Sequence, residues 1–288
     1  MATLATVLEL LDLEPLEENL FRGNSPQEEQ QRVFGGQVAG QALVAAGRTV
    51  ESKERVTHSL HSYFLRPGDP RVPIVYQVDR TRDGRSFATR RVTAIQHGKP
   101  IFVLSASFMR PEDGIDRSHP MPDVPPPEQL LSMAERLEKM GTTLPPEDVA
   151  WVQRERAIEL RHVDAREYLD QEDKEPRNPI WIRTAGPIES DDPLLHQCLV
   201  AYASDMTLID TAMRPHLRAL AAAEDAQVAS LDHAMWFHRP CRADEWLLYD
   251  QESSSFGHAR GFTTARLYRQ SGELVVSVAQ EGLIRLRP

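Results

Sequence analysis

The chain has 288 residues, of which 41% are hydrophobic and 26% are charged, and its mean hydropathy is −0.44. This composition is typical of a folded globular chain of one large or two smaller domains, and it excludes an intrinsically disordered one. The net charge of −10 and the pI near 5.5 argue against nucleic acid as a partner, because binding to a phosphate backbone needs a basic face.

Three further features bear on where the chain acts. No apolar run approaches the roughly 18 residues that a membrane-spanning helix needs. The N-terminal segment, residues 1–21, is acidic and amphipathic and lacks the basic start of a secretory signal, and the C-terminal IRLRP differs from the S-K-L type of peroxisomal address. Two cysteines, Cys198 and Cys241, are too few for a disulfide framework or a cysteine-based zinc site, and both are expected to be small buried residues. These features predict a cytoplasmic protein.

The first element with a clear pattern is a helix over residues 35–47, GGQVAGQALVAAG. Between residues 38 and 46 only Gln41 is polar, and a helix that is apolar on every side is buried on every side. Strand-like segments follow as HSLHSYFLRPGD, PIVYQVDRTRDG and FATRRVTAIQHGKPIFVLSASF, the last with a Gly-containing hairpin. This order predicts an antiparallel sheet curled about one central helix.

The middle of the chain is rich in proline. Twelve of the 21 prolines fall within residues 111–193, and proline interrupts both strand ladders and helix interiors. Within this region, residues 128–140 (EQLLSMAERLEKM) have the spacing of an amphipathic helix, and residues 157–163 and 179–188 are predicted to be strands. Much of the stretch should therefore be connector.

The region after the connector repeats the first pattern. A mostly apolar helix is predicted over residues 194–209, followed by VASLDHAMWFHRPCRADEW, LLYDQESS and GFTTARLYRQSGELVVSVAQEGLIRL. Aligning Arg66-Pro67 with Arg239-Pro240 gives an offset of 173 residues, and the final hairpins align within about two residues of it. A period this long indicates two copies of one domain. We expect an N-terminal repeat over 1–112, a connector over 113–155 and a C-terminal repeat over 156–288.

One helix wrapped by a curved antiparallel sheet is the hotdog arrangement. The expected fold class is therefore α+β, and the expected architecture is a double hotdog with two such repeats. The two sheets should join into one continuous antiparallel sheet, with residues 111–155 lying across its outside.

Four motifs then make the chain similar to a known family. QRVFGGQVAGQAL, HSLHSYFLRPGD, RDGRSFATRRV and LDHAMWFHRP occur in this order, and together they strongly resemble the acyl-CoA thioesterase II family, the TesB-like double-hotdog thioesterases. The resemblance covers nearly the whole chain and is weakest across residues 111–190. It implies hydrolysis of fatty acyl-CoA to free fatty acid and coenzyme A, without a metal or other cofactor, by a homo-oligomer (a dimer or a tetramer).

The resemblance also implies three catalytic residues that position a hydrolytic water. They fall on Asp205 in AYASDMTLI, Ser230 in VASLDHAMW, where many relatives have Thr, and Gln280 in VAQEGLIR. Asp205 also stands out by its setting in an otherwise apolar helix, where a carboxylate must be paired, hydrogen-bonded or functional. Strand alternation predicts that Ser230 and Asp232 share one face and that His233 points the other way.

The absence of certain motifs and the spacing of the histidines argue against several kinds of catalytic site. No G-x-S-x-G elbow is present, which disfavours a Ser-His-Asp thioesterase, and the resemblance implies attack by an Asp-activated water without a covalent intermediate. No glycine-rich phosphate loop supports a nucleotide cofactor. His58 and His61, like His233 and His238, are an odd number of residues apart, which places each pair on opposite strand faces and argues against a shared metal. His58 stays open as an auxiliary acid or base.

Two alternative functions also stay open. Asp191 and His196 resemble in their spacing the signature of hotdog enoyl-CoA hydratases and dehydratases, although Asp192 stands where that signature has Asn and Ser190 where it has Gly. The other alternative is a non-catalytic protein that binds acyl-CoA without turnover.

Coenzyme A carries phosphates that basic side chains should meet. The candidates are arginines on predicted strands and turns, namely Arg66, Arg82, Arg85, Arg90 and Arg91 in the first repeat and Arg239 and Arg266 in the second. The sequence does not choose among them.

Overall fold

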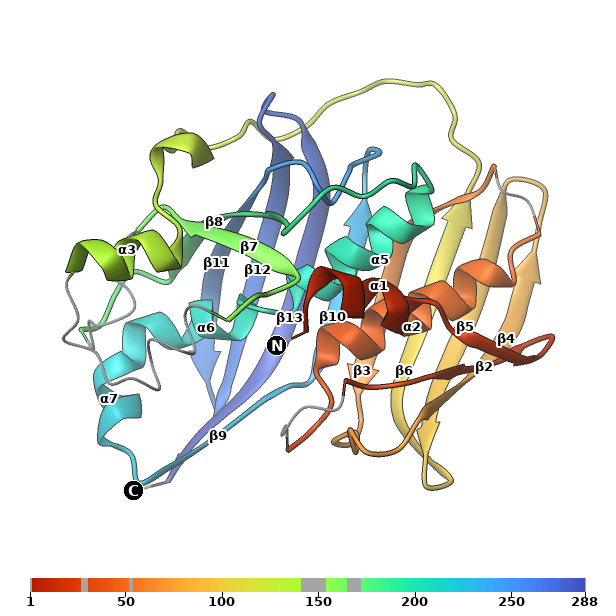
Figure 1. The fold of residues 1–288 in the computed structure, drawn as a ribbon, viewed down its shortest axis with the longest axis horizontal. Coiled ribbons are helices and arrows are strands. Elements are labelled where there is room, and N and C mark those ends of the chain that lie inside the picture. Colours follow the sequence, from red (N-terminus) through yellow and green to blue (C-terminus); the bar gives the residue numbers. More distant parts are fainter. Residues whose placement is uncertain (1, 27–30, 52–53, 141–153, 165–171, 288) are drawn as a thin grey trace.

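The computed structural model describes residues 2–26, 31–51, 54–140, 154–164 and 172–287. Among these residues, thirteen strands form one antiparallel sheet that curves around two long helices (Figure 1). The first half contains α1 (Leu4–Leu11), β1 (Glu14–Glu17), β2 (Leu20–Gly23), α2 (Gly35–Arg48), β3 (Val56–Phe64), β4 (Ile74–Asp83), β5 (Phe87–Gln96) and β6 (Lys99–Met109).

The connector and the second half continue the chain. The connector contains the 3-10 helix η1 (Pro127–Gln129) and α3 (Met133–Met140). The second half contains β7 (Ile158–His162), β8 (Arg177–Thr184), α5 (Pro193–Ser204), α6 (Leu208–Met213), η2 (Arg214–His216), α7 (Leu217–Ala222), β9 (Asp225–Ser230), β10 (Asp232–Phe237), β11 (Leu247–Gly257), β12 (Arg260–Arg269) and β13 (Leu274–Arg287).

The two halves share one sheet. The strand order is β1-β2-β4-β5-β6-β3-β10-β13-β12-β11-β8-β7, with β9 paired to β13, so the halves meet where β3 pairs with β10. At this junction Leu60 lies opposite Met235 in antiparallel register. The expected double hotdog with one continuous antiparallel sheet is therefore confirmed.

The internal duplication is visible in the strand boundaries. An offset of 173 residues carries β5 (Phe87–Gln96) onto β12 (Arg260–Arg269) without a shift at either end. The same offset carries Tyr76 of β4 onto Tyr249 of β11, and both side chains are fully buried. Residues related by this offset can be compared as equivalents.

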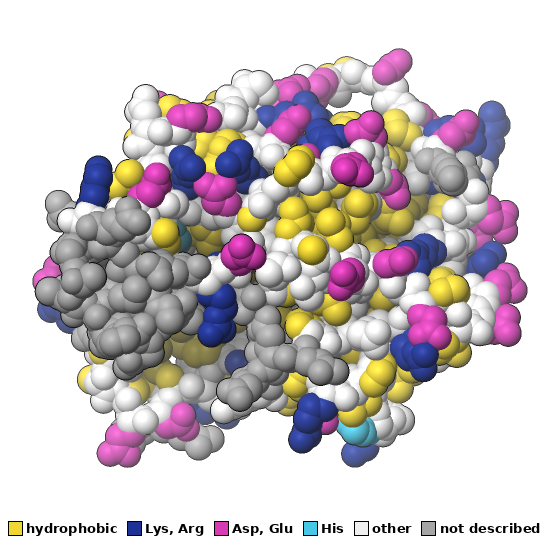
Figure 2. Space-filling view, in the orientation of Figure 1, with side chains coloured by type: hydrophobic (Ala, Val, Ile, Leu, Met, Phe, Trp, Pro, Cys, Tyr) yellow, Lys and Arg dark blue, Asp and Glu magenta, His cyan; other side chains and the backbone are white. Residues whose placement is uncertain are grey.

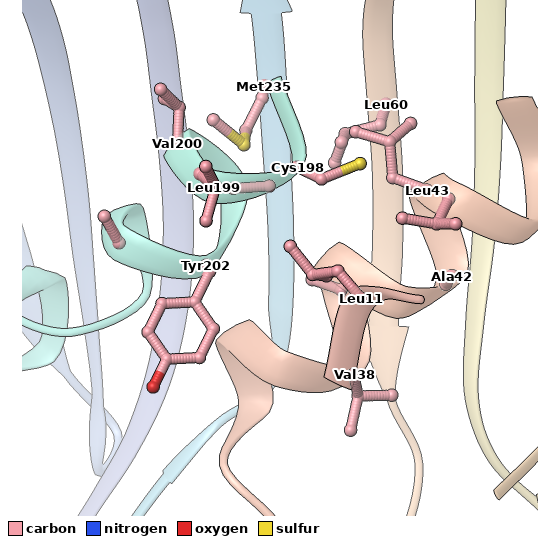
Figure 3. Packing of buried hydrophobic residues seen from close by; sticks show 14 of the residues in the cluster. Leu11, Val38, Ala42, Leu43, Leu60, Cys198, Leu199, Val200, Tyr202 and Met235 are labelled. Carbon is pink, nitrogen blue, oxygen red and sulfur yellow. The ribbon is translucent and has the colours of Figure 1, made fainter. Parts of the chain in front are cut away.

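The central helices are buried and pack against each other in antiparallel fashion. Every residue of α2 from 36 to 46 is buried, as its all-round apolar pattern predicts. A Cβ added to Gly40 would stand 3.2 Å from the Cys198 carbonyl oxygen of α5, so the two backbones approach closely. Figure 3 shows Leu43 of α2 and Cys198 of α5 in this core. Cys198 and Cys241 are both free and buried, as expected.

Two predicted helices have different limits. The helix predicted over 194–209 is interrupted, because α5 ends at Ser204 and α6 begins at Leu208. The helix predicted over 128–140 begins only at Met133. There the Ser132 hydroxyl accepts from the Glu135 N–H, and the Glu135 carboxylate accepts from the Ser132 N–H. This pair is a capping box, which fixes the start of α3.

The connector covers part of the outer face of the second half. Met121, Val124 and Leu130 pack against an outer cluster of apolar side chains, which are Trp181, Trp246, Leu248, Tyr268 and Leu274. The connector was expected to lie across the outside of the sheet, and the described part of it does; residues 141–153 fall outside the described residues. Figure 2 shows hydrophobic atoms gathered over the helix layer, with charged side chains around them. None of the helices in the described ranges is both long and apolar enough to cross a membrane.

Candidate active site

The C-terminus of α5 meets the N-terminus of α2. Asp205 is the residue that ends α5, and its carboxylate accepts a hydrogen bond from the Gly36 N–H in the first turn of α2. A Cβ at Gly35 would lie 2.5 Å from Asp205 Oδ2, so only glycine lets the α2 backbone come this close. Asp205 therefore stands at a helix boundary. Its apolar neighbours in the sequence had suggested a position within a helix.

Two further donors reach the same carboxylate from the sheet. The Gln280 side chain of β13 donates through Nε2 to Asp205 Oδ1 at 2.5 Å, and the Ser230 hydroxyl of β9 donates to the same oxygen at 3.3 Å. The three residues predicted from the family resemblance are thus brought together from three separate elements.

The surroundings of Asp205 tune its acidity in two directions. Burial raises the pKa of Asp205 to about 6, while the hydrogen bonds from Gln280, Ser230 and the Gly36 N–H pull the pKa downward because they favour the charged form. A carboxyl group with this pKa is about nine-tenths ionised at pH 7. Asp205 is therefore a base whose proton affinity lies near neutral pH, as general-base catalysis requires.

A cavity of about 730 Å³ opens beside the carboxylate. Asp205 and Ser230 line it, whereas Gln280 is buried behind Asp205. Most of the other lining side chains are apolar, among them Phe34, Phe64, Phe102, Tyr202, Met206 and Ile209. Its size and lining suit a small-molecule ligand with an apolar part.

The strand carrying Ser230 differs from the prediction. β9 ends at Ser230 and β10 begins at Asp232, so the side-chain alternation is interrupted at Leu231. His233 therefore also points inward, with Nε2 2.8 Å from Ser204 Oγ, while Asp232 accepts from the Glu281 N–H. The prediction that Ser230 and Asp232 share a face opposite to His233 is wrong for this reason.

The histidine pairs also differ from strict alternation. A bulge between Thr57 and Ser59 brings His58 Nε2 to within 2.7 Å of Ser107 Oγ, on the same outer face where His61 packs edge-on against Trp236. The prediction that His58 and His61 lie on opposite faces is therefore wrong. His58 lies outside the cavity lining. Across the described residues, no group of three His, Cys, Asp or Glu side chains has the geometry of a metal site.

The residues of the hydratase-like pattern have structural partners. Asp191 forms an ion pair with Arg242, and buried His196 lies 2.9 Å from the Ser190 carbonyl oxygen and accepts from the Ala243 N–H. They lie at the opposite end of α5 from Asp205: at 1.5 Å per residue, His196 is about 13 Å along the helix from it, and Asp191 precedes the helix. Neither lines the cavity.

The candidate arginines differ in whether they are available to bind a phosphate. Arg90 is fully buried and bonded to Thr49 and Asp83, so it is unavailable to a phosphate. Arg239 is paired with Asp116 of the connector. Arg66 lines the cavity, as does Arg32, and neither has an acidic partner among the described residues. The other four candidates, Arg82, Arg85, Arg91 and Arg266, do not line it.

Sequence reasoning missed several residues of this site. Arg32, Gly35 and Gly36 lie in or beside the QRVFGGQ motif, which was noted for its resemblance and not for its chemistry. The doubled glycine at the start of a buried helix was the available signal, because it permits a close approach of backbone to a reacting group.

The fold and the site together define a double-hotdog protein with a buried carboxylate at the meeting point of two central helices. Comparison with known proteins agrees. Residues 24–109 match the model of the acyl-CoA thioesterase N-terminal domain, and residues 153–283 match the acyl-CoA thioesterase model.

Individual relatives extend this match over the chain. Human acyl-coenzyme A thioesterase 8 is 43% identical over 98% of this chain and 89% of its own length. Acyl-CoA thioesterase 2 of Haemophilus influenzae is 38% identical over 98% of each chain. The crystal structure of acyl-CoA thioesterase II TesB2 from Mycobacterium marinum superposes with a TM-score of 0.79 at 46% identity, covering 98% of each chain. The chain belongs to the acyl-CoA thioesterase family and is a thioester hydrolase.

Proposed function

We propose that this protein hydrolyses fatty acyl-CoA to free fatty acid and coenzyme A by direct attack of a water molecule held at Asp205, without a covalent intermediate. The observation that carries the proposal is the Asp205 carboxylate, which is buried against an apolar cavity and held by the Ser230 hydroxyl and the Gln280 amide. Its pKa of about 6 leaves it ionised at neutral pH.

In this mechanism Asp205 accepts a proton as the water oxygen attacks the thioester carbonyl carbon. Ser230 and Gln280 fix the carboxylate, and Ser230 also lies at the cavity wall within reach of the water. The tetrahedral intermediate then expels the coenzyme A thiolate, which receives the proton from Asp205. The proton is thus returned, and no bond to the enzyme is formed.

The oxyanion of the intermediate needs hydrogen-bond donors, and the N-terminus of α2 supplies them. Phe34 at the N-cap makes no side-chain capping bond. The Gly36 N–H is bonded to Asp205, while Gly35 and Gln37 of the same first turn line the cavity. Backbone N–H groups at a helix N-terminus carry partial positive charge and stabilise an adjacent anion. Such preorganised donors act where negative charge develops.

The substrate class follows from the cavity lining. The aromatic and aliphatic side chains receive the acyl chain, and Arg66, with Arg32, is available to the anionic coenzyme A portion. Both guanidinium groups are oriented by backbone carbonyls, Arg66 by Pro100 and Arg32 by Val228, and a guanidinium has further N–H donors beyond the one used in each case. Two arginines on the cavity lining favour an anionic substrate in a chain whose net charge is −10.

The cellular setting is part of the same proposal. We propose that the protein acts in the cytoplasm as a homo-oligomer, a dimer or a tetramer. We also propose that the N-terminal repeat ends at residue 112 and that the C-terminal repeat begins at residue 156. Family resemblance supports the assembly. Light scattering coupled to size-exclusion chromatography gives the mass in solution, and a monomer would contradict it.

The decisive experiment is Asp205→Asn, assayed by thiol release from acyl-CoA. Because general-base catalysis contributes about 10²–10⁴-fold, kcat should fall by that factor while KM changes little. Burial raises the pKa of Asp205 from its usual 3.8 to about 6, so its ionisation lowers the free energy of unfolding as pH rises from about 3.8 to about 6, and the loss is complete above that. The neutral Asn variant should therefore unfold no more readily at pH 8.

Asp191→Asn is the matched control, because Asp191 is an exposed aspartate at the other end of α5. Its kcat should stay within a few-fold of the parent. Normal turnover by Asp205→Asn, with circular dichroism showing a folded protein, would overturn the mechanism.

Incubation with crotonyl-CoA tests the alternative hydratase function, since hydration consumes the enone absorbance whereas hydrolysis releases thiol.

A further inference from the structure

Behind Asp205, a tyrosine holds the end of α5. Tyr249 of β11 is fully buried, and its hydroxyl donates a 2.7 Å hydrogen bond to the Ser204 carbonyl oxygen. This carbonyl and the Asp205 nitrogen belong to the same planar peptide group. The tyrosine therefore fixes the plane from which the Asp205 side chain departs.

The Ser204 side chain is held as well. Its hydroxyl donates to the Ala201 carbonyl oxygen at 3.0 Å and lies 2.8 Å from Nε2 of buried His233. Burial lowers the pKa of His233 to about 4, so the imidazole is neutral at physiological pH. The backbone carbonyl of His233 in turn accepts from the Ser62 hydroxyl of β3 in the first half. Ser204 is thus fixed through both its backbone and its side chain, from β11 and β10.

The first half holds an equivalent tyrosine with a different partner. Tyr76 is related to Tyr249 by the 173-residue offset, is equally buried and also donates at 2.7 Å. Its acceptor, however, is the Gln41 side chain in the middle of α2. Gln41 lies about 9 Å along the helix from Gly35, at 1.5 Å per residue. The Tyr249 hydroxyl therefore contacts the Ser204–Asp205 peptide, whereas the equivalent Tyr76 hydroxyl does not.

We propose that Tyr249 is a positioning residue for hydrolysis, which holds the Ser204–Asp205 peptide, with His233 as its partner on the Ser204 side chain, so that the carboxylate stays aligned on the attacking water. This inference rests on the proposed function, because it assumes that Asp205 acts on that water. Ser230, Gln280 and the Gly36 N–H hold the carboxylate itself, whereas the backbone from which it departs lies at the end of a helix, where the last turn tends to fray. A displacement of about 1 Å at a reacting group is costly in rate.

The test compares Tyr249→Phe with Tyr76→Phe. Each removes one buried hydroxyl and keeps the ring, so both should lower Tm to a similar extent. Only Tyr249→Phe should lower kcat, by about five- to tenfold, with KM within twofold of the parent. Equal kcat losses in the two variants, or a Tyr249→Phe kcat within twofold of the parent, would overturn the proposal.

A double variant separates this inference from the proposed function. In an Asp205→Asn background, Tyr249→Phe should cost no further activity, because both changes act through one carboxylate. If Asp205→Asn alone keeps full activity, the proposed function fails. If Asp205→Asn is inactive but Tyr249→Phe is normal, only the positioning role fails. Ser204→Ala breaks the His233 contact and provides a second route if Tyr249→Phe does not fold; it should lower kcat in the same direction, and an unchanged kcat would contradict the proposal.

Discussion

At one end of the α2–α5 pair, Asp205 closes α5 beside the N-terminus of α2; at the other end, Thr49 closes α2 beside the N-terminus of α5. The N-terminus of α2 has no cap from its own N-cap residue, Phe34; its Gly36 N–H is bonded to Asp205, and Gly35 beside it lines the cavity. The N-terminus of α5 is capped by its own N-cap residue, Asp192, whose side chain accepts from the Leu194 N–H. The same backbone arrangement therefore has an open end and a closed end.

The strands beneath these two ends carry different side chains, and this difference also separates an open end from a closed one. Thr263 lies opposite Gln280 under Asp205, and at the equivalent place Arg90 lies opposite Ala106 under Thr49. The Arg90 guanidinium donates to both the Thr49 hydroxyl, at 2.9 Å, and the Thr49 carbonyl oxygen, at 3.0 Å. At the closed end, the Arg90 side chain, with five donors, satisfies the acceptors of Thr49; at the open end, the Gln280 amide donates to the Asp205 carboxylate. In the proposed mechanism, the duplicated fold thus keeps one end for stability and one for chemistry.

Among changes that leave Asp205 in place, removing the Ser230 hydroxyl at the open end should have the largest effect on rate. Ser230→Ala loses a hydrogen bond to a charged group, worth roughly 1.5–3 kcal/mol, so kcat should fall by about 10- to 150-fold. Ser230→Thr should stay active. The matched change is Thr57→Val at the equivalent position, where the buried hydroxyl has no hydrogen-bond partner in the described part of the chain, and its kcat should not change. Thiol release measures all three; a fall to the uncatalysed rate in Ser230→Ala would indicate a covalent role instead.

Emptying the closed end should affect folding and not catalysis. Arg90→Met leaves buried acceptors at Thr49 without a donor, so the free energy of unfolding should fall by about 2 kcal/mol or more, roughly a 30-fold change in the unfolding equilibrium. Urea denaturation measures the loss, and Arg91→Met, at the exposed neighbour, should show little of it. A kcat loss comparable to that of Ser230→Ala would contradict the assignment of this end to stability.

The pH dependence should report only the open end. Because burial raises the pKa of Asp205 to about 6 and the ionised form is the base, kcat/KM should fall about tenfold per pH unit below pH 6 and level off above it. Ser230→Ala removes a donor that favours the charged form, so the midpoint should move upward in pH. A midpoint near the ordinary aspartate value of 3.8 would mean that another group limits the rate.

The smallest effect is expected for the equivalent arginines Arg66 and Arg239. Both donate to a backbone carbonyl, but Arg239 is paired with Asp116 while Arg66 faces the cavity. Arg66→Ala should raise KM for acyl-CoA about two- to fivefold, as for an exposed ionic contact, and the difference should shrink at high salt. Arg239→Ala should leave KM unchanged. Equal KM values for the two variants at low salt would remove Arg66 from substrate binding.

The sequence by itself determined the architecture. An apolar pattern around a whole helix predicts burial on every side, strand alternation predicts the flanking sheet, and the 173-residue offset reveals the duplication; each is a local or internal regularity that needs no coordinates. Asp205, Ser230 and Gln280 came from motifs that resemble those of a family. These three side chains are in contact in the structure.

The tertiary structure alone decided which groups are free to react. The last residue of α5, Ser204, contacts Tyr249 and His233, on strands distant in sequence, and no periodicity within residues 194–209 predicts these contacts. In the sequence, Arg66 and Arg90 are both arginines in strand-rich regions, yet one lines a cavity and the other is buried against Thr49. Local patterns report the preference of a segment for a conformation and a face, whereas the partner of a polar group is set by strand pairing and helix contacts across the whole chain.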